Sequence, residues 1–396
     1  MIAPARSVAA EVVRRVFEEG AYTDRAFATE AAALDTRDRG LAQRIAYGTV
    51  QRVRTIDHGI ETIGKRPLRK LDPPVRAALR IAAYEFGWSD TPAHAIADDA
   101  VELVRKAKLE RAVPFTNAVA RRLAQGFRGM VASLPEGALK HSYPDWIAEV
   151  WERDWGTAES LDLMRAQNEP GELAVRSVEP AGEPTDIPGA WRVDRIDRDA
   201  LAAGQIWPQS RGSQLAGLVV GSQDGERVLD ACAAPGGKAT MLRGAVTAVE
   251  LHPGRARELE ENARRLGATN VRVVNVDVRE LAERDFDRAL LDAPCSGLGV
   301  LSRRPDLRWR SKPLAALQLE LLRAVAERTR PGGTIVYSVC TLNADENEAV
   351  VDASGLTVEP LGDEWPGFVH PKRPEFLLAT PHRHHTSGFF IARLRV

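Results

Sequence analysis

Residues 227–238 read Arg227-Val228-Leu229-Asp230-Ala231-Cys232-Ala233-Ala234-Pro235-Gly236-Gly237-Lys238. The apolar run at 227–232 predicts a buried parallel strand, and the Pro-Gly-Gly turn predicts a tight loop that leads into a helix. Glycines let the backbone approach a ligand closely, and a helix N-terminus offers free N–H groups. The stretch therefore predicts a cofactor cradle at a strand end.

This loop is not a phosphate loop, because Cys232 and Ala239 stand where that motif needs its first Gly and its Ser or Thr. It is not a Gly-x-Gly-x-x-Gly dinucleotide fingerprint either. The alternative is a glycine turn that only tightens a junction between a strand and a helix.

The chain after residue 227 alternates strand and helix patterns, which is typical of a doubly wound parallel sheet. Ligands of such sheets bind beyond the carboxyl ends of the strands, where the strand order reverses. The expected strands are 227–232, 246–251, 271–276, 287–292, 334–340 and 388–395, and the expected helices are 254–266, 312–329 and 344–352.

The length of 396 residues predicts two or three domains. No apolar run approaches the roughly 18 residues of a membrane span, and charged residues interrupt the N-terminus, so we expect a cytoplasmic protein. Residues 1–140 carry 23 basic and 17 acidic side chains, a net charge of +6, whereas residues 141–396 carry −7. The N-terminal part is therefore the better candidate for contact with a polyanion.

Residues 5–127 show apolar positions at helical spacing and no strand signals, which predicts a bundle of about six helices. Lys65, Arg66, Arg69 and Lys70 surround one expected turn. They suit contact with RNA phosphates, although a solvated loop explains them equally well. His94 follows Thr91-Pro92 and is expected at a helix entry rather than in a catalytic set.

The middle of the chain predicts a linker and a small connector. Trp146, Val150, Trp151 and Trp155 recur at helical spacing and are expected to form a core face. Residues 168–200 are rich in Pro, Gly and Asp and predict irregular structure with some strands. The expected domains are a helical domain at 1–135, a linker with an α+β connector at 136–205, and a catalytic domain at 206–396.

Three acids follow the expected strands at their carboxyl ends. Glu250 is placed to bind two ribose hydroxyls, and Asp277 could accept from an adenine amino group. A helix N-cap is the rival interpretation for each acid alone. Without a phosphate-binding signature, the set favours S-adenosylmethionine over NAD, held by residues 232–238, Glu250, Asp277 and Asp292.

The chain has three cysteines, Cys232, Cys295 and Cys340, which excludes a disulfide scaffold. Cys295 and Cys340 end adjacent expected strands, so both thiols can face one crevice. Either cysteine by itself is most simply interpreted as a small buried hydrophobic residue. The presence of both at neighbouring strand ends favours covalent catalysis. A thiolate that adds to carbon 6 of cytosine makes carbon 5 nucleophilic, and Asp292 is placed to stabilise charge near ring nitrogen 3.

These motifs resemble the Sun/RsmB family of RNA cytosine-5 methyltransferases. The resemblance rests on Cys232–Lys238, on Asp292-Ala-Pro-Cys-Ser-Gly297, and on the Cys340 segment with Asn343, Glu346, Asn347 and Glu348. It implies a Rossmann-like class I methyltransferase domain with Cys340 as nucleophile, Cys295 assisting product release, and Asp292 and Lys238 as further catalytic residues. Cytosine-5 methyltransferases of DNA use the Pro-Cys cysteine instead.

The N-terminal stretch resembles the NusB-like helical domain of some RNA-modifying enzymes, which implies an all-α RNA-binding bundle and a substrate in 16S ribosomal RNA. The motifs that carry it are Asp38–Ala42, Tyr47–Val50, Pro92–Ala95, Ala100–Leu103 and Phe115–Val119. The chain departs from the methyltransferase family pattern at four positions, which are Val339, Ala239, Ser210 and Ser387.

Two further clusters are ambiguous in the sequence. An Arg/Trp cluster after the Pro-Cys segment suits phosphate contact and base stacking, with a plain surface loop as the rival. Its members are Arg303, Arg304, Arg308, Trp309 and Arg310. The histidines at 382, 384 and 385 lack other ligands at metal spacing, so we expect no metal.

Together these features predict a monomeric S-adenosylmethionine-dependent enzyme that forms 5-methylcytosine in 16S ribosomal RNA, either free or in an early small-subunit particle, with no membrane and no metal partner. Two rivals stay open. One is a non-catalytic RNA-binding or assembly factor with a relic methyltransferase domain. The other is a cytosine-5 methyltransferase that acts on another RNA.

Overall fold

The computed structural model describes residues 3–396 and divides into two compact units. The first runs to Asn168 and includes Leu301–Arg310, and the second comprises Glu169–Val300 and Ser311–Val396. The expected connector at 136–205 is therefore split between the units at Asn168. The domain boundaries expected at 135 and 205 stay predictions.

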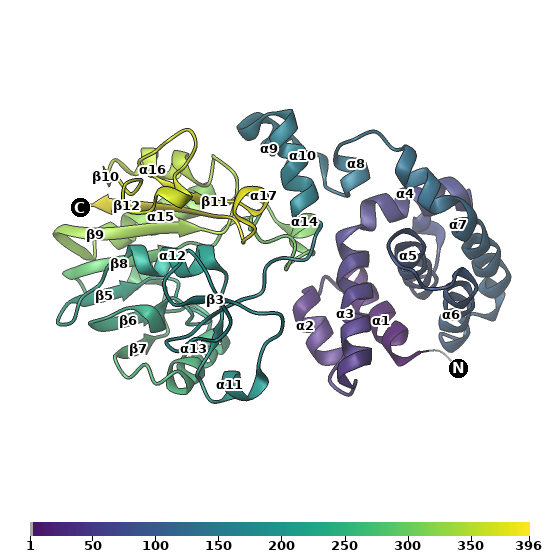
Figure 1. Cartoon of the computed structure of the whole chain (residues 1–396), viewed down its shortest axis with the longest axis horizontal. Coiled ribbons are helices and arrows are strands. Elements are labelled where there is room, and N and C mark those ends of the chain that lie inside the picture. The colour runs from purple at the N-terminus through teal and green to yellow at the C-terminus, as the bar shows by residue number, and fades with distance from the viewer. Residues whose placement is uncertain (1–2) are drawn as a thin grey trace. The chain divides into compact units, whose positions relative to one another are not determined.

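The first unit is all helical, as predicted (Figure 1). Pro residues at the first helical positions of α1, α5 and α7 fit there because the missing N–H would have no helical partner. Its helices are α1 Pro4–Glu18, α2 Thr23–Glu30, α3 Thr36–Gln51, α4 Val53–Gly64, α5 Pro73–Trp88, α6 Ala93–Lys106, α7 Val113–Ser133, α8 Ala138–His141, α9 Asp145–Trp155, α10 Thr157–Ala166 and α14 Leu307–Arg310.

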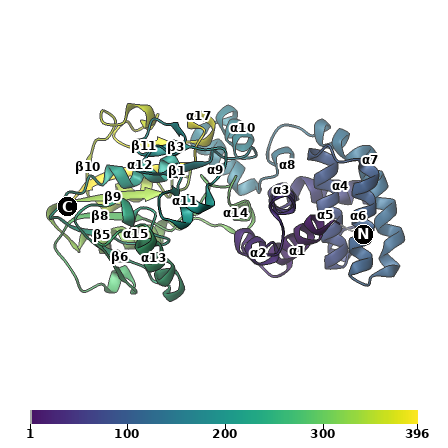
Figure 2. The same cartoon turned by 60° about the horizontal axis from the view of Figure 1, so that its bottom comes forward.

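The core of this unit lies among α1–α7, which pack together (Figure 2). Trp151 of α9 is fully buried as expected, but Trp146, Val150 and Trp155 are only partly buried, and the other buried residue of this helix is Ile147. A buried ion pair joins Arg6 to Glu85 at 2.7 Å, and Asp99 lies 3.1 Å from the same guanidinium. None of the helices within residues 3–396 is long and apolar enough to span a membrane.

The segment 301–310 packs into the helical unit, although it begins 133 residues after Asn168, where the rest of that unit ends. Arg308 is 0% exposed, its guanidinium lies 3.9 Å from the centre of the Tyr143 ring, and burial lowers its pKa to about 10. Its acceptors are Gln51 O at 3.2 Å, Ser142 O at 3.3 Å, Asn168 Oδ1 at 2.8 Å and Gln167 O at 2.9 Å.

This packing corrects one expectation from the sequence. Arg308 cannot contact RNA phosphates because protein atoms surround it completely. Trp309 donates from its indole nitrogen to Val50 O at 2.7 Å and is partly buried against the helical core, so base stacking on its ring stays a prediction. Arg304 lies over the Tyr22 ring, and Arg310 donates to Gly20 O at 3.1 Å.

Replacing Arg308 by Leu is expected to destabilise the protein by at least about 3 kcal/mol, because several buried acceptors lose their donor at about 1–3 kcal/mol each. Urea unfolding measures this change. Arg310→Leu is the matched control, since Arg310 is exposed and its loss is expected to cost less than about 1 kcal/mol. Equal stability of the two variants would contradict the structural role of Arg308.

The second unit is built on a mixed sheet with the strand order β10-β12-β9-β8-β5-β6-β7, and β11 pairs with β12 (Figure 1). Its strands are β5 Arg227–Asp230, β6 Ala245–Val249, β7 Val271–Val274, β8 Phe286–Asp292, β9 Thr329–Val339, β10 Thr357–Glu359, β11 Leu377–Ala379 and β12 Phe389–Arg395. Its helices are α11 Arg198–Ala202, α12 Arg211–Val219, α13 Pro253–Arg265, α15 Ala315–Ala326, α16 Glu348–Ser354 and α17 Pro381–His384.

All six predicted strands are present, and β5–β9 run parallel as expected. The last strand, β12, differs because it runs antiparallel to β9. Helices α12 and α15 both pack against β9. The resulting Rossmann-like architecture agrees with the fold expected from the sequence.

Residues 169–208 contain a second, four-stranded antiparallel sheet of order β2-β3-β1-β4. Its strands are β1 Ala174–Arg176, β2 Glu183–Pro184, β3 Ala190–Arg192 and β4 Trp207–Pro208. The sequence predicted strands here without their bounds. Their shortness explains why, since two or three residues show no periodicity.

Candidate active site

The strand order of the large sheet reverses between β5 and β8, which is the position where such sheets bind ligands. The predicted glycine loop follows β5, and Asp292 ends β8. Cys340 directly follows β9, the next strand along the sheet. The topology thus brings the glycine loop, Asp292 and Cys340 to one edge of the sheet.

The glycine loop is held by the small antiparallel sheet. Gly236 has a φ of +107°, which only glycine adopts without strain, and a Cβ on Gly237 would lie 2.6 Å from the Trp207 indole nitrogen. Arg176 donates to Gly237 O at 2.6 Å and to Thr240 Oγ1 at 2.8 Å. Sequence reasoning missed Arg176 and Trp207, because no local pattern marks either as a partner of the loop.

Asp292 and Lys238 form one hydrogen-bonded pair at the end of β8. The Lys238 ammonium lies 2.6 Å from Asp292 Oδ2, and the Ser338 hydroxyl donates to Asp292 Oδ1 at 2.8 Å. Two of the predicted catalytic residues are therefore in direct contact. Ser338 was not predicted, although it precedes Cys340 by only two residues.

Cys295 and Cys340 meet at the ends of β8 and β9, with 3.5 Å between their sulfur atoms. The hydrogen bond to Cys340 raises the pKa of the Cys295 thiol, and burial and the charge of Glu346 raise it further. These effects disfavour the ionised form of Cys295. Cys232 stands apart from this pair, and burial raises the pKa of its thiol as well.

Asp277 is the N-cap of the short 3-10 helix Val278–Glu280, as the rival interpretation held, whereas Glu250 lies two residues before His252, the N-cap of α13, and is not itself a helix N-cap. Glu250 Oε1 accepts from His252 N at 2.9 Å, and Asp277 Oδ1 accepts from Arg279 N at 2.9 Å. The hydrogen bond from the Arg279 guanidinium holds the pKa of Asp277 below its usual range. These hydrogen bonds leave other lone pairs on both carboxylates, so the contacts with ribose and adenine stay predictions.

Asp230, the last residue of β5, is a further acid of this site. It is 1% exposed, and within residues 3–396 no side chain hydrogen-bonds its carboxylate oxygens. Burial raises its pKa to about 7, although the charge of Lys238 opposes this effect. The carboxylates of Asp230, Glu250 and Asp292 fit the expected S-adenosylmethionine, which carries a sulfonium and an ammonium group.

The pKa of Asp230 makes the stability of the free protein depend on pH. In the unfolded chain the pKa of Asp230 has its usual value of 3.8, and in the folded protein it is about 7. The contribution of Asp230 to the free energy of unfolding is therefore fully present below pH 4 and is lost as the pH rises through about 7. Asp230→Asn should remove this loss, which amounts to up to about 4 kcal/mol between pH 4 and pH 8. Urea unfolding of both proteins across this range measures it, and parallel stability curves would contradict it.

The other predicted features lie outside this edge of the sheet. Lys65, Arg66, Arg69 and Lys70 are exposed around the turn after α4, and His94 lies exposed in the first turn of α6. His384 accepts from Thr380 N at 2.9 Å through Nδ1. Among residues 3–396, no three His, Cys, Asp or Glu side chains are grouped to hold a metal ion.

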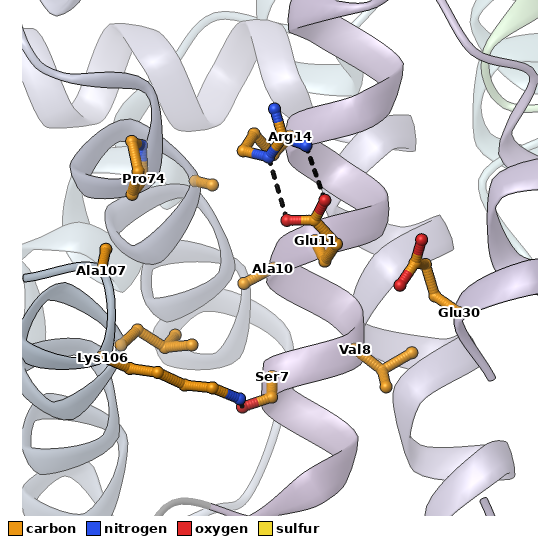
Figure 3. Close-up of a pocket in the computed structure, with 11 residues that line it drawn as sticks. Ser7, Val8, Ala10, Glu11, Arg14, Glu30, Pro74, Lys106 and Ala107 are labelled. Carbon is orange, nitrogen blue, oxygen red and sulfur yellow. Dashed lines mark hydrogen bonds and ion pairs between the residues drawn. The ribbon is translucent and has the colours of Figure 1, made fainter. Parts of the chain in front are cut away.

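A separate pocket of about 370 Å³ lies in the helical unit, among α1, α2, α5 and α6 (Figure 3). Glu11 and Arg14 form an ion pair on one wall, and Lys106 donates to the Ser7 hydroxyl on another. Its lining carries both signs of charge and none of the predicted catalytic or cofactor-binding residues.

Both parts of the chain match known families. Residues 218–395 match the family described as 16S rRNA methyltransferase RsmB/F, and residues 3–125 match the NusB family. The probable ribosomal RNA small subunit methyltransferase B of Synechocystis sp. is 32% identical over 443 residues, which cover 99% of each chain.

Two solved structures share the fold. The crystal structure of PH0851 superposes with a TM-score of 0.79 and 24% identity, covering 100% of both chains. The structure of NSun6 from Pyrococcus horikoshii with SFG has a TM-score of 0.56 and 23% identity, and covers 64% of this chain and 98% of that one. At these identities the similarity establishes the fold alone.

Proposed function

Because the chain belongs to the RsmB/F family of 16S ribosomal RNA methyltransferases, we propose that it methylates carbon 5 of a cytosine in 16S ribosomal RNA through a covalent Cys340 adduct. The family assignment makes the protein an S-adenosylmethionine-dependent ribosomal RNA methyltransferase. The observation that carries the finer proposal is the 3.5 Å separation of the Cys295 and Cys340 sulfur atoms at adjacent strand ends.

S-adenosylmethionine, when bound, supplies the methyl group. We assign its binding to residues 232–238 with Glu250, Asp277 and Asp292, and add Asp230 as a carboxylate near its positive charges. NSun6, which shares the fold, was solved with SFG, an analogue of S-adenosylmethionine, and this supports the choice of cofactor.

In the proposed reaction, the Cys340 thiolate forms a bond to carbon 6, and the electrons of the 5,6 double bond move toward nitrogen 3 and oxygen 2 of the ring. This charge is negative, so the Lys238 ammonium offsets it, and Asp292, which accepts a hydrogen bond from that ammonium at 2.6 Å, passes a proton from it to nitrogen 3. Carbon 5 is then nucleophilic enough to accept the methyl group.

Release reverses the addition. The proton on carbon 5 passes to solvent, the double bond forms again, and the bond between carbon 6 and the Cys340 sulfur breaks. The leaving sulfur carries a negative charge, and the Cys295 thiol is the nearest described donor, at 3.5 Å. A hydrogen bond from Cys295 therefore assists the departure of Cys340.

The helical unit is the proposed RNA-binding part, since its family match covers residues 3–125 and the basic turn at Lys65–Lys70 is exposed. Incubation of the full chain with 16S ribosomal RNA and S-adenosylmethionine, followed by nucleoside mass spectrometry, tests the proposal. We expect 5-methylcytidine. A methyl group on another base atom would refute cytosine-5 chemistry, and no methylation of naked RNA or small-subunit particles would favour a non-catalytic assembly factor.

A further inference from the structure

Glu346 is a fully buried carboxylate six residues after Cys340, and the reaction described above gives it no task. It accepts hydrogen bonds from five donors. These are Ser296 N at 2.9 Å, the Ser296 hydroxyl, Leu314 N at 3.1 Å, Gln318 Nε2 at 3.0 Å and Asn343 Nδ2 at 3.3 Å.

The donors come from three segments that are far apart in the sequence. Ser296 directly follows Cys295, and Asn343 follows Cys340 by three residues. Gln318 of α15 also donates to Pro294 O at 2.9 Å, on the other side of Cys295. One carboxylate thus holds the backbone on both sides of Cys295 to the loop that carries Cys340.

Direct contacts between the two loops complete this arrangement. The hydroxyls of Ser296 and Thr341 are hydrogen-bonded at 2.7 Å. Gly299 N donates to Cys340 O at 2.9 Å. Because each contact involves a residue next to a reactive cysteine or the cysteine itself, small shifts here change the separation of the two sulfur atoms.

Glu346 is also a buried acid without an ion-pair partner in the described part of the chain. Within residues 3–396, no Lys, Arg or His side chain forms an ion pair with it, so hydrogen-bond donors alone offset the cost of burying the anion. Its negative charge disfavours a second anion nearby, and this is one cause of the raised pKa of Cys295.

We propose that Glu346 is a positioning residue that holds Cys295 against Cys340 and keeps Cys295 as the neutral hydrogen-bond donor to the departing sulfur. This inference rests on the proposed covalent cytosine-5 reaction. Glu346 touches neither RNA nor cofactor in this role and acts only through the two cysteine loops.

The test is Glu346→Gln in the full chain, which removes the charge and keeps the shape. With RNA and S-adenosylmethionine, we expect covalent RNA–protein complex to accumulate, as in Cys295→Ala, and kcat to fall at least about tenfold because release slows. The ratio kcat/KM for RNA should stay unchanged, because a slower release step after methyl transfer lowers kcat and KM together. Glu348→Gln is the matched control, since Glu348 instead contacts His370 at 2.6 Å.

A second measurement needs no RNA. The rate at which iodoacetamide alkylates Cys295, followed by peptide mass spectrometry across pH, should reach half its maximum at lower pH in Glu346→Gln than in the wild type or Glu348→Gln. A residue with a merely structural role would not shift this profile selectively. Ser296→Ala, which removes one shared hydroxyl, gives a milder variant if Glu346→Gln does not fold, and its covalent complex should also accumulate.

The outcomes separate the two proposals. Complex that accumulates in Cys295→Ala but not in Glu346→Gln, or an unchanged alkylation profile of Cys295, overturns the role of Glu346. If neither variant accumulates complex while the profile shifts as expected, the covalent reaction is overturned and the influence of Glu346 on Cys295 stands.

Discussion

Replacing Cys340 by alanine is expected to abolish methyl transfer, by at least about 10⁴-fold, because it removes the thiol that we assign as the nucleophile toward carbon 6. The Cys340 sulfur lies at the end of β9 beside Cys295, whereas the raised pKa of Cys232 keeps that thiol neutral. Transfer of radiolabelled methyl groups to 16S ribosomal RNA measures the loss.

The same variant should bind S-adenosylmethionine normally, since Cys340 is outside the glycine loop and its strand-end acids. Calorimetric titration is the control that separates a lost nucleophile from a damaged fold. Substantial methylation by Cys340→Ala, with inactivity of Cys295→Ala, would assign the nucleophile to Cys295 instead, as in the DNA enzymes.

Cys295→Ala is expected to give the opposite behaviour. Methyl transfer should still occur once, but the Cys340 sulfur leaves slowly without its hydrogen-bond donor, so enzyme and RNA stay covalently joined. A slowly migrating band on a denaturing gel, dependent on S-adenosylmethionine, should rise from trace amounts to a large fraction of the enzyme.

The double variant Cys295→Ala/Cys340→Ala is the control for this result and should show no band. Normal turnover by Cys295→Ala without a band would mean that Cys295 has no part in release. A band that persists in the double variant would place the covalent bond on another residue.

The sequence predicted the part of the site that depends on local pattern and topology. A short apolar run that ends in Pro-Gly-Gly identified β5 and its loop, and alternation of strands and helices placed Asp292, Cys295 and Cys340 at neighbouring strand ends. Parallel strands of a doubly wound sheet end at one edge, so the meeting of the two cysteines followed from the order of elements.

The rest depends on contacts between distant residues that leave no periodic signal. Arg308 looked like an RNA-binding arginine because its neighbours are basic, yet it is buried against acceptors more than 100 residues away in sequence. Arg176 holds the glycine loop across 61 residues. The contacts of Glu346 likewise required the packing of α15 against the cysteine loops.

The central claim is a covalent bond between Cys340 and a cytosine that is methylated at carbon 5. RNA containing 5-fluorocytidine tests it most directly, because fluorine at carbon 5 cannot leave as a proton and the adduct should persist in the wild-type enzyme. After digestion with nuclease and protease, mass spectrometry should find a methylated fluorocytidine nucleotide on the peptide that contains Cys340. A nucleotide on the Cys295 peptide, or no nucleotide on any peptide while ordinary RNA is methylated, would contradict the account.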